Sequence, residues 1–454
     1  MTDAPIASTA HGRVRGATDE GIHVFKGIPY GATTIGAARF HAPAPPADWS
    51  GIRDALAYPP MAPQSIFTPG SLFASWTFDK ELSEDCLALN VWTPGLRDRA
   101  RRPVMVWFHG GDFSSLSGSR NVYDGVRLCR RGDVVVVTVN HRLNAFGYMY
   151  LAEAAPQLAA AANPGMLDLV AALRWVHDNI AEFGGDPDNV TIFGQSGGGG
   201  KVTRLMHMPA AKGLFHKVIC QSGGAVNYRN TDPAKVIQGQ QAVAAETLKN
   251  LNLTGSQIDK LKSVLYRDLL AAGNTATQTL ARQGVQGAMG WNPVADDHYV
   301  LREFCDWADT IPYMVGNVLS EFSSNLARGE FTKNEWTHKE VDEKLAAAFG
   351  DKKDAIVAEY KKLYPNKKVQ DVLFLDSRFR PGSKTMLAMK LERTKAPVYN
   401  YMFTYEYQVN GGVTAFHCSE IAFAFHALGE PHIRIATGGA PFFPRSPELG
   451  ATAS

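Results

Sequence analysis

The sequence predicts an α/β fold with a mostly parallel central sheet, and two observations carry that prediction. The first is a set of short apolar runs rich in β-branched residues, at 104–108, 134–139, 190–193 and 217–220. The second is the helical spacing of apolar residues in DLVAALRWVHDNIAEFGGD, between the second and third runs. Strands that alternate with helices form parallel sheets covered by helices on both faces.

Two later stretches are predicted to be helical excursions beside this sheet. The chain from about 233 to 288 becomes polar and helical, and we interpret it as part of a cap over a pocket. A second, charged helical pattern covers about 339 to 363 and precedes a further strand at 398–403. No repeat or low-complexity tract separates these parts, so we expect one continuous domain over residues 1–454.

Composition narrows the classes of partner. The 454 residues are 45% hydrophobic and carry a formal net charge of +2, as in globular chains with a large core. A balanced charge supplies no basic field for phosphate backbones, so we expect no nucleic-acid partner. No apolar stretch reaches the length of a membrane helix, and the first residues lack a secretory pattern, so we expect no membrane association.

The cysteines predict the redox compartment. Their number is odd, they are widely spread, and none forms a C-x-x-C pair: Cys86, Cys129, Cys220, Cys305 and Cys418. That distribution favours reduced thiols over a disulfide framework or a zinc site. We therefore expect a cytoplasmic protein with no metal and no other cofactor.

A G-x-S-x-G motif follows the strand at 190–193, as Gly194-Gln195-Ser196-Gly197-Gly198. Between a strand and a glycine-rich helix start, this motif forms a sharp turn that exposes the serine hydroxyl at the carboxyl edge of the sheet. The alternative is an ordinary glycine-rich turn. A phosphate loop is excluded because Gln195 stands where its first glycine would be. Ser196 is the candidate nucleophile.

A second glycine-rich loop follows the strand at 104–108, in His109-Gly110-Gly111-Asp112-Phe113. Free backbone N–H groups after a buried strand can stabilise the oxyanion of an acyl-transfer intermediate, and the N–H of the residue after the nucleophile adds to them. Gly110, Gly111 and Gly197 are the candidate donors. A simple tight turn at His109 to Gly111 would be the better interpretation without Ser196.

A serine nucleophile needs a histidine base and a carboxylate that orients it. In this type of sheet the chain order is serine, acid, histidine, which leaves His207, His216, His298, His338, His417, His426 and His432. His417 follows a predicted strand and a glycine-bearing loop, and Glu321 follows a predicted strand at 312–316. Spacing alone leaves both assignments open against surface or core roles.

The chain resembles the type B carboxylesterases, which include cholinesterases and bacterial para-nitrobenzyl esterases. The matching segments include GRVRG, VFKGIPYG, SEDCLALNVW, PVMVWFHGGDF, VVVVTVNHRLNAFG, NPGMLDLVAALRWVHDNIAEFGGDPDNVTIFGQSGGG and KGLFHKVICQSG. The resemblance implies an α/β-hydrolase fold with a triad of Ser196, Glu321 and His417, and with an oxyanion hole of Gly110, Gly111 and Gly197. It also implies that Ser222 lies near the triad and helps to hold it.

The chain departs from the family pattern at several positions. The turn reads G-Q-S-G-G where the family usually has G-E-S-A-G, so Gln195 replaces a carboxylate beside the nucleophile. Phe322 stands where a glycine usually follows the acid. Cys86 has no earlier cysteine with which to form the disulfide of secreted relatives. The chain is also short after His417 for this family, from which we expect a less well supported histidine loop.

The candidate substrate-binding residues are aromatic. The family places the rim of its gorge at the segment SIFTPGSLFASWTFDK, which contains Phe67, Phe73, Trp76 and Phe78. Trp76 has the spacing from Cys86 at which cholinesterases place a tryptophan that stacks on quaternary ammonium groups, although an ordinary apolar wall is the simpler interpretation. An uncharged aromatic gorge favours neutral esters with small to medium acyl groups or aromatic alcohol parts.

Two functional hypotheses result. The first is a serine hydrolase that cleaves carboxylic esters through an acyl-enzyme intermediate. The second is a catalytically silent binding protein, like the adhesion proteins that share this fold but typically lack the nucleophile. The presence of Ser196 favours the enzyme. A homo-oligomer, in which a partner subunit covers the apolar face near the C-terminus, stays open.

Overall fold

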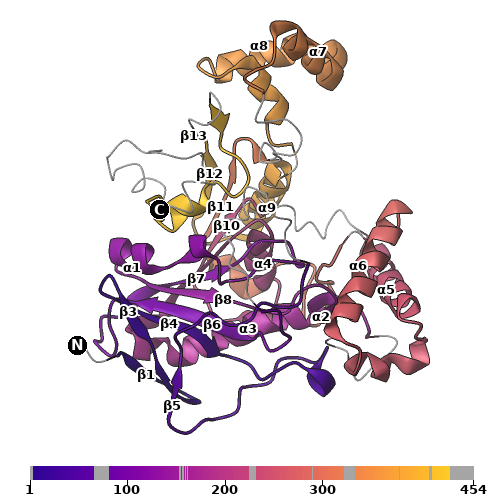
Figure 1. Cartoon of the computed structure of the whole chain (residues 1–454). Coiled ribbons are helices and arrows are strands. Elements are labelled where there is room, and N and C mark those ends of the chain that lie inside the picture. The colour runs from indigo at the N-terminus through magenta and orange to yellow at the C-terminus, as the bar shows by residue number, and fades with distance from the viewer. Residues whose placement is uncertain are drawn as a thin grey trace.

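A sheet of nine strands organises the part of the chain that the computed structural model describes (Figure 1). That part comprises residues 4–65, 81–152, 155, 158, 160, 162–223, 232–288, 290–321, 333–377, 379–407 and 412–429. The strand order is β12-β11-β10-β9-β7-β8-β6-β4-β3. The strands span β3 Ala17–Asp19, β4 Ile22–Pro29, β6 Ala88–Thr93, β7 Arg102–Phe108, β8 Val135–Val139, β9 Gly185–Gln195, β10 Lys217–Gln221, β11 Tyr313–Val318 and β12 Val398–Phe403.

The predicted α/β fold with a mostly parallel sheet is confirmed. From β12 to β8 every neighbouring pair is parallel, whereas β6, β4 and β3 add an antiparallel edge. The predicted strands correspond to β7, β8, β9, β10 and β12, and β11 contains the segment that precedes Glu321. In such sheets the loops at the carboxyl ends of the parallel strands meet at one edge, where ligands bind.

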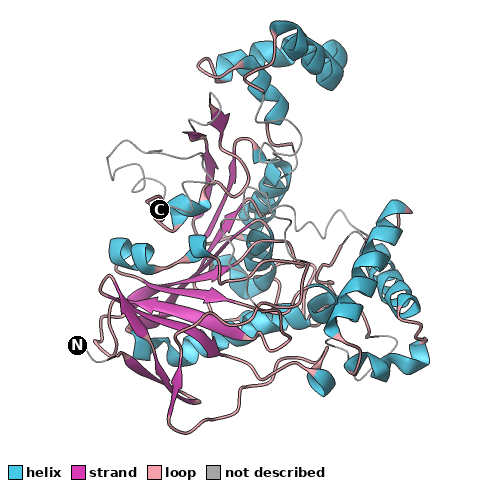
Figure 2. Cartoon of the chain, viewed as in Figure 1, coloured by secondary structure: helices cyan, strands magenta, loops and turns pink. Residues whose placement is uncertain are grey.

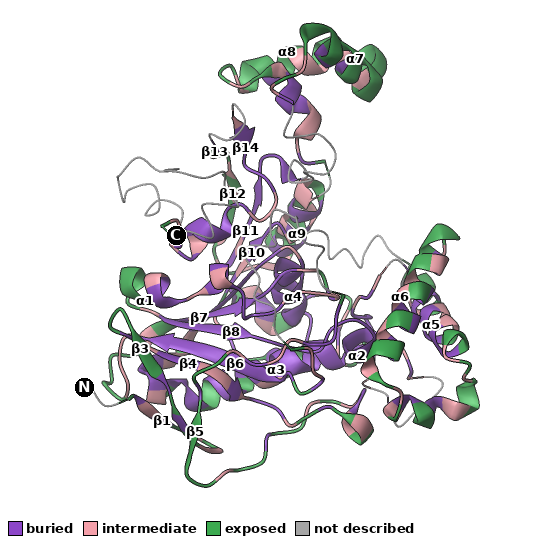
Figure 3. Ribbon diagram, viewed as in Figure 1, coloured by how far each residue is buried: buried purple, intermediate pink, exposed green. Residues whose placement is uncertain are grey.

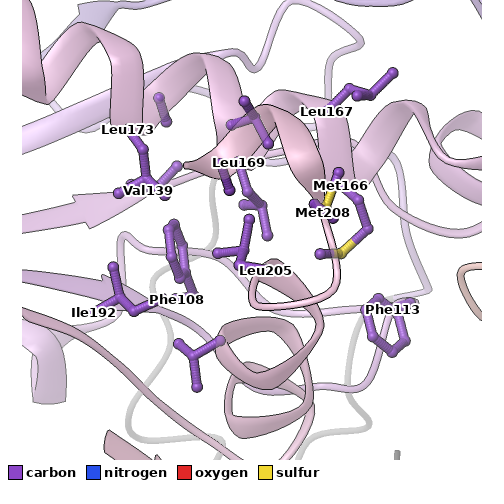
Figure 4. Close-up of a cluster of buried hydrophobic side chains, with 14 of the residues drawn as sticks. Phe108, Phe113, Val139, Met166, Leu167, Leu169, Leu173, Ile192, Leu205 and Met208 are labelled. Atoms are coloured by element: carbon purple, nitrogen blue, oxygen red, sulfur yellow. The ribbon is translucent and has the colours of Figure 1, made fainter. Parts of the chain in front are cut away.

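Helices cover both faces of the sheet. Along β7, Val104, Val106 and Phe108 join one apolar cluster, while Met105 and Trp107 join or pack against the other. The first cluster includes residues of α3 (Pro164–Asn179) and α4 (Gly197–Leu205), as Figure 4 shows around Phe108. The second includes residues of α1 (Val126–Gly132) and α10 (Ile421–Ala424). The central strands are therefore buried between helices (Figure 3).

The predicted excursions are helical (Figure 2). They comprise α5 Pro233–Asn250, α6 Tyr266–Arg282, α7 His338–Phe349 and α8 Lys353–Leu363. Helices α7 and α8 stand away from the sheet in Figure 1 and have a small apolar cluster of their own. Two further helices lie in the described residues: the short α2, Asn144–Tyr148, and the longer α9, Phe379–Arg393, which packs beside β11.

The remaining strands lie outside the main sheet. β1 (Ile6–Thr9), β2 (Gly12–Arg15) and β5 (Ile52–Asp54) form a small sheet, and β13 (Glu406–Tyr407) pairs with β14 (Val413–Thr414). Across the described residues, no helix has the length and apolar character needed to cross a bilayer. The aromatic rim residues Phe67, Phe73, Trp76 and Phe78 lie outside the described residues, as do Phe322 and the C-terminal residues from 430 onward.

Candidate active site

Ser196 occupies a strained turn between β9 and α4. Its φ of 58° and ψ of −124° lie outside the regions that serine ordinarily adopts. The turn is held because the Ser196 N–H donates to the Gln221 carbonyl (2.8 Å) and the Ser196 carbonyl accepts from the Gly200 N–H (3.0 Å). Gln195 and Gly197 are buried, whereas Ser196 is partly exposed. The backbone thus presents this side chain at the surface of an otherwise buried turn.

Glycines make this turn sterically accessible. A Cβ added at Gly198 would lie 2.0 Å from the Phe108 carbonyl oxygen, and one at Gly194 would lie 2.6 Å from the same atom. These distances are far below van der Waals contact, so neither position accepts a side chain without moving β7 away from α4. The G-x-S-x-G pattern therefore follows from the close approach of the helix start to the neighbouring strand.

The loop after β7 lies directly beside Ser196. A Cβ built on Gly110 would lie 3.5 Å from the Ser196 Cβ. Within the described residues, the N–H groups of Gly110, Gly111 and Gly197 donate no hydrogen bond. Gly197 also begins α4, where the helix dipole adds positive potential. These N–H groups are therefore available to stabilise a negative oxygen near Ser196.

The loops that carry Glu321 and His417 are joined by backbone hydrogen bonds. Ser320 donates its N–H to the Ala415 carbonyl (2.9 Å), and His417 donates its N–H to the Glu321 carbonyl (3.0 Å). The loop after β11 and the loop after β14 thus run side by side at the carboxyl edge of the sheet. This arrangement brings together two residues that lie far apart in the sequence.

Glu321 and His417 form an acid–base pair in which the acid is buried and the histidine is partly exposed. The Glu321 carboxylate is fully buried, and its Oε2 accepts a hydrogen bond from His417 Nδ1 at 2.6 Å. Its Oε1 accepts the Val318 N–H (3.1 Å) and lies 3.4 Å from Asn317 Nδ2. These donors fix the carboxylate, which in turn fixes the tautomer that leaves His417 Nε2 free to accept a proton.

The hydrogen bond between Ser196 and His417 that a catalytic triad requires is not formed in this structure. Among the described residues, neither Ser196 Oγ nor His417 Nε2 has the other as a hydrogen-bond partner. Instead Gln195 Nε2 lies 3.4 Å from both ring nitrogens of His417. An atom in the ring plane at equal distance from both nitrogens would be too close to Cε1, so the Gln195 amide nitrogen lies over the face of the ring. Proton transfer from Ser196 to His417 therefore requires the two side chains to approach each other.

Further contacts orient the His417 ring. Phe379, at the start of α9, stacks on it with centroids 4.8 Å apart and an interplanar angle of 16°. Gln195 Oε1 accepts the Cys418 thiol at 3.1 Å, which ties the residue after His417 to the residue before Ser196. Phe379 and Cys418 were not predicted, because stacking and thiol contacts leave no spacing pattern in the sequence.

The pKa of His417 is raised well above its ordinary value. Burial lowers this pKa, but the neighbouring Cys418 sulfur and the hydrogen-bonded Glu321 carboxylate raise it by more. As the candidate base, His417 acts only when neutral, so we expect kcat/KM for an uncharged substrate to rise with pH through a midpoint above the ordinary imidazole pKa of about 6.5. A pH–rate profile checks this. A midpoint at or below that value would contradict a histidine stabilised in its charged form.

Two more residues at this edge of the sheet are buried. Ser222, at the end of β10, is fully buried and its Oγ has no hydrogen-bond partner among the described residues. Its predicted role beside the triad stays a prediction. Glu420 is also buried, and neither of its carboxyl oxygens has a side-chain hydrogen-bond partner there. Burial, reinforced by the charge of Glu321, raises the pKa of this carboxyl group to about 8. Glu420 is therefore mostly neutral at pH 7.

No group of three or more histidine, cysteine, aspartate or glutamate residues among the described residues could hold a metal ion. The chemistry available at this edge of the sheet is that of a serine, a histidine paired with a carboxylate, and free backbone N–H groups. With the order of its strands, this arrangement defines the chain as an α/β-hydrolase.

The protein belongs to the carboxylesterase family, whose profile matches residues 3–434. It is 43% identical to the para-nitrobenzyl esterase of Bacillus subtilis over 270 residues, and this alignment covers 59% of this chain. It is 33% identical over 463 residues to a medium-chain fatty acyl-CoA hydrolase precursor of Anas platyrhynchos, with 95% of this chain and 80% of the relative covered.

Solved structures give the same family. An esterase from anaerobic Clostridium hathewayi that can hydrolyse aliphatic aromatic polyesters matches with a TM-score of 0.83 and 38% identity, over 96% of this chain and 87% of that one. A thermophilic para-nitrobenzyl esterase matches with a TM-score of 0.76 and 32% identity, over 99% and 89%. The alignment with the B. subtilis enzyme spans about half of that relative, 52% of its length.

Proposed function

We propose that the protein is a serine hydrolase that cleaves carboxylic esters through an acyl-enzyme intermediate. The observation that carries the proposal is the Glu321–His417 pair, which lies at the same edge of the sheet as the strained Ser196 turn. A buried carboxylate that holds a histidine beside such a turn serves to activate a serine. Membership of the carboxylesterase family supports the same activity.

The residues divide the reaction between them. His417 Nε2 takes the proton of Ser196 as Oγ attacks the ester carbonyl carbon, and Glu321 stabilises the resulting imidazolium. The N–H groups of Gly110, Gly111 and Gly197 stabilise the oxyanion of the tetrahedral intermediate. His417 then gives the proton to the departing alkoxide. Water, deprotonated by His417, attacks the acyl-enzyme, and the proton returns to Ser196 as the acid is released.

We propose neutral esters of small to medium size, or with aromatic alcohol parts, as the substrates. Gln195 supports a preference for neutral substrates, because the group that lies over the catalytic histidine is an uncharged amide and not a carboxylate. Relatives named for para-nitrobenzyl esters and for aliphatic aromatic polyesters support the aromatic part. We also propose a cytoplasmic location, which the five free cysteines support. Four of the five are buried, so thiol titration of the denatured, unreduced protein is needed to count them, and cell fractionation tests the location itself.

The test is a pre-steady-state time course with p-nitrophenyl butyrate. We expect a burst of p-nitrophenol, one equivalent per active site, followed by slower steady turnover, because p-nitrophenol leaves in a fast first step and the acyl-enzyme accumulates before its slower hydrolysis. A fluorophosphonate should label Ser196 in the same stoichiometry and abolish both phases. A choline ester of the same acid is the matched comparison, and we expect it to be cleaved less efficiently.

The competing hypothesis is a silent binding protein of the same fold. It predicts no turnover above buffer and no fluorophosphonate adduct, although the protein would still be folded. Turnover without a Ser196 adduct would instead show that the ester is cleaved at another nucleophile. Either result would overturn the proposed function.

A further inference from the structure

A buried lysine connects helix α4, which begins after Ser196, to the loop after β7 that contains Gly110 and Gly111. We call this loop the candidate oxyanion loop. Lys201 lies in the second turn of α4 and is fully buried. Its Nζ donates a hydrogen bond to the His109 carbonyl at 2.8 Å, and it lies 5.4 Å from the centre of the Phe113 ring. His109 and Phe113 flank the loop, so Lys201 contacts residues at both of its ends.

Burying an ammonium group in this position is unfavourable. Burial lowers the pKa of Lys201 to about 7, even though Asp112 attracts the charge. Lys201 forms no salt bridge within the described residues. The adjacent His109 and His141 supply no negative charge, and they are neutral because burial lowers the pKa of each well below the ordinary value. An apolar side chain would fill the space without this cost, so what Lys201 adds is its hydrogen bond.

That hydrogen bond fixes the direction of an oxyanion donor. The His109 carbonyl and the Gly110 N–H belong to one planar trans peptide, so the two groups point in opposite directions. When Lys201 holds the carbonyl, the Gly110 N–H must point away from Lys201. Gly110 lies beside Ser196, with its Cβ position 3.5 Å from the serine Cβ. A rotation of this peptide would replace the donor with a carbonyl oxygen.

The next two carbonyls of the loop are held from within the loop. His109 Nδ1 donates to the Gly110 carbonyl at 2.8 Å, and the Gly111 carbonyl accepts the N–H groups of Ser114 and Ser115 at 3.1 Å. These local contacts shape the loop but do not tie it to the nucleophile. Lys201 provides that connection, because its own helix begins at the residue after Ser196.

We propose that Lys201 is a positioning residue that holds the His109–Gly110 peptide in the orientation required for oxyanion stabilisation. The proposal rests on the proposed ester hydrolysis. It assigns Lys201 no contact with the substrate, since the side chain is fully buried. Its effect should therefore be confined to the step in which negative charge develops on the carbonyl oxygen.

The test uses Lys201→Met, which keeps the length of the side chain and removes the donor. With p-nitrophenyl butyrate we expect kcat per active site to fall by about 10²-fold, as for loss of one oxyanion donor, while KM stays within about twofold. The inhibition constant of a trifluoromethyl ketone, which forms a tetrahedral adduct with the serine, should rise by a similar factor. Lys201→Leu should give the same pattern.

Lys390→Met is the matched control. Lys390 is also fully buried and donates to a backbone carbonyl, that of Ala308, outside the candidate site. Active-site titration with a fluorophosphonate counts the folded fraction of every variant. Unchanged kcat and inhibitor affinity in both Lys201 variants, a loss confined to KM, or an equal loss in the Lys390 variant would overturn the proposal. Absence of turnover in the wild type would instead refute the proposed function.

Discussion

Ser196→Ala is expected to remove nearly all esterase activity, with a fall in kcat of about 10⁴-fold or more. The variant has no Oγ to form the acyl-enzyme, so both the burst and the fluorophosphonate adduct should disappear. Residual hydrolysis would come from the backbone N–H groups of the oxyanion loop acting on a bound ester and water. Steady-state and burst kinetics on p-nitrophenyl butyrate measure the change.

The same variant should fold normally, which separates loss of chemistry from loss of structure. Ser196 is partly exposed, and its Oγ forms no hydrogen bond within the described residues, so alanine removes no structural contact there. The strained φ of 58° is equally unfavourable for alanine. We expect a thermal midpoint close to that of the wild type, and no lower than that of the exposed control Ser263→Ala, which loses a hydrogen bond from Ser263 Oγ to the Lys260 carbonyl. Retained turnover in the alanine variant would identify a different nucleophile.

Much of the fold could be predicted because the buried strands of the sheet are recognisable from their apolar residues in short segments of the sequence. β8 and the inner parts of β7 (104–108) and β9 (190–193) lie between the helical layers, so their sequences are nearly continuous apolar runs. The Ser196 turn was predictable for a similar reason. The distances at Gly194 and Gly198 leave no space for a side chain, so the turn requires glycine at both positions, and these two glycines form the recognisable motif.

Helix α9 shows where local patterns failed. It begins Phe379-Arg380-Pro381-Gly382, and a proline followed by a glycine ordinarily indicates a turn. Proline is nevertheless tolerated in the first turn of a helix, where its missing N–H would have no partner. Because the helix was not predicted, neither was the stacking of Phe379 on His417.

Side-chain direction was the other limit. The sequence places Gln195 and Lys201 close to the nucleophile along the chain, but not where their polar atoms point. Contacts in the fold decide that Gln195 lies over His417 and that Lys201 reaches back to the His109 carbonyl. The sequence does contain one signal for the Lys201 contact. A lysine one turn inside a helix that packs against a buried sheet must have a polar partner, because charged side chains are rarely buried without one.

Glu321→Gln is the second large effect that we expect. The amide keeps the shape of the side chain but removes the charge that stabilises the His417 imidazolium, and its NH₂ group can face Nδ1 and select the wrong tautomer. In the serine protease template such a change lowers kcat by roughly 10⁴-fold. We expect a similar fall with KM little changed, and the rising limb of the pH profile should move to lower pH.

Glu420→Gln provides a matched control for that variant, because both carboxyl groups are buried near His417 but differ in charge and contacts. The pKa of Glu420 is raised to about 8, so at pH 7 its carboxyl is already mostly neutral and an amide changes little. We expect kcat within about tenfold of the wild type at pH 7, a loss of about 1.4 kcal/mol or less in transition-state stabilisation. Near-normal kcat in Glu321→Gln, together with a large loss in Glu420→Gln, would show that Glu420 is the carboxylate that serves His417.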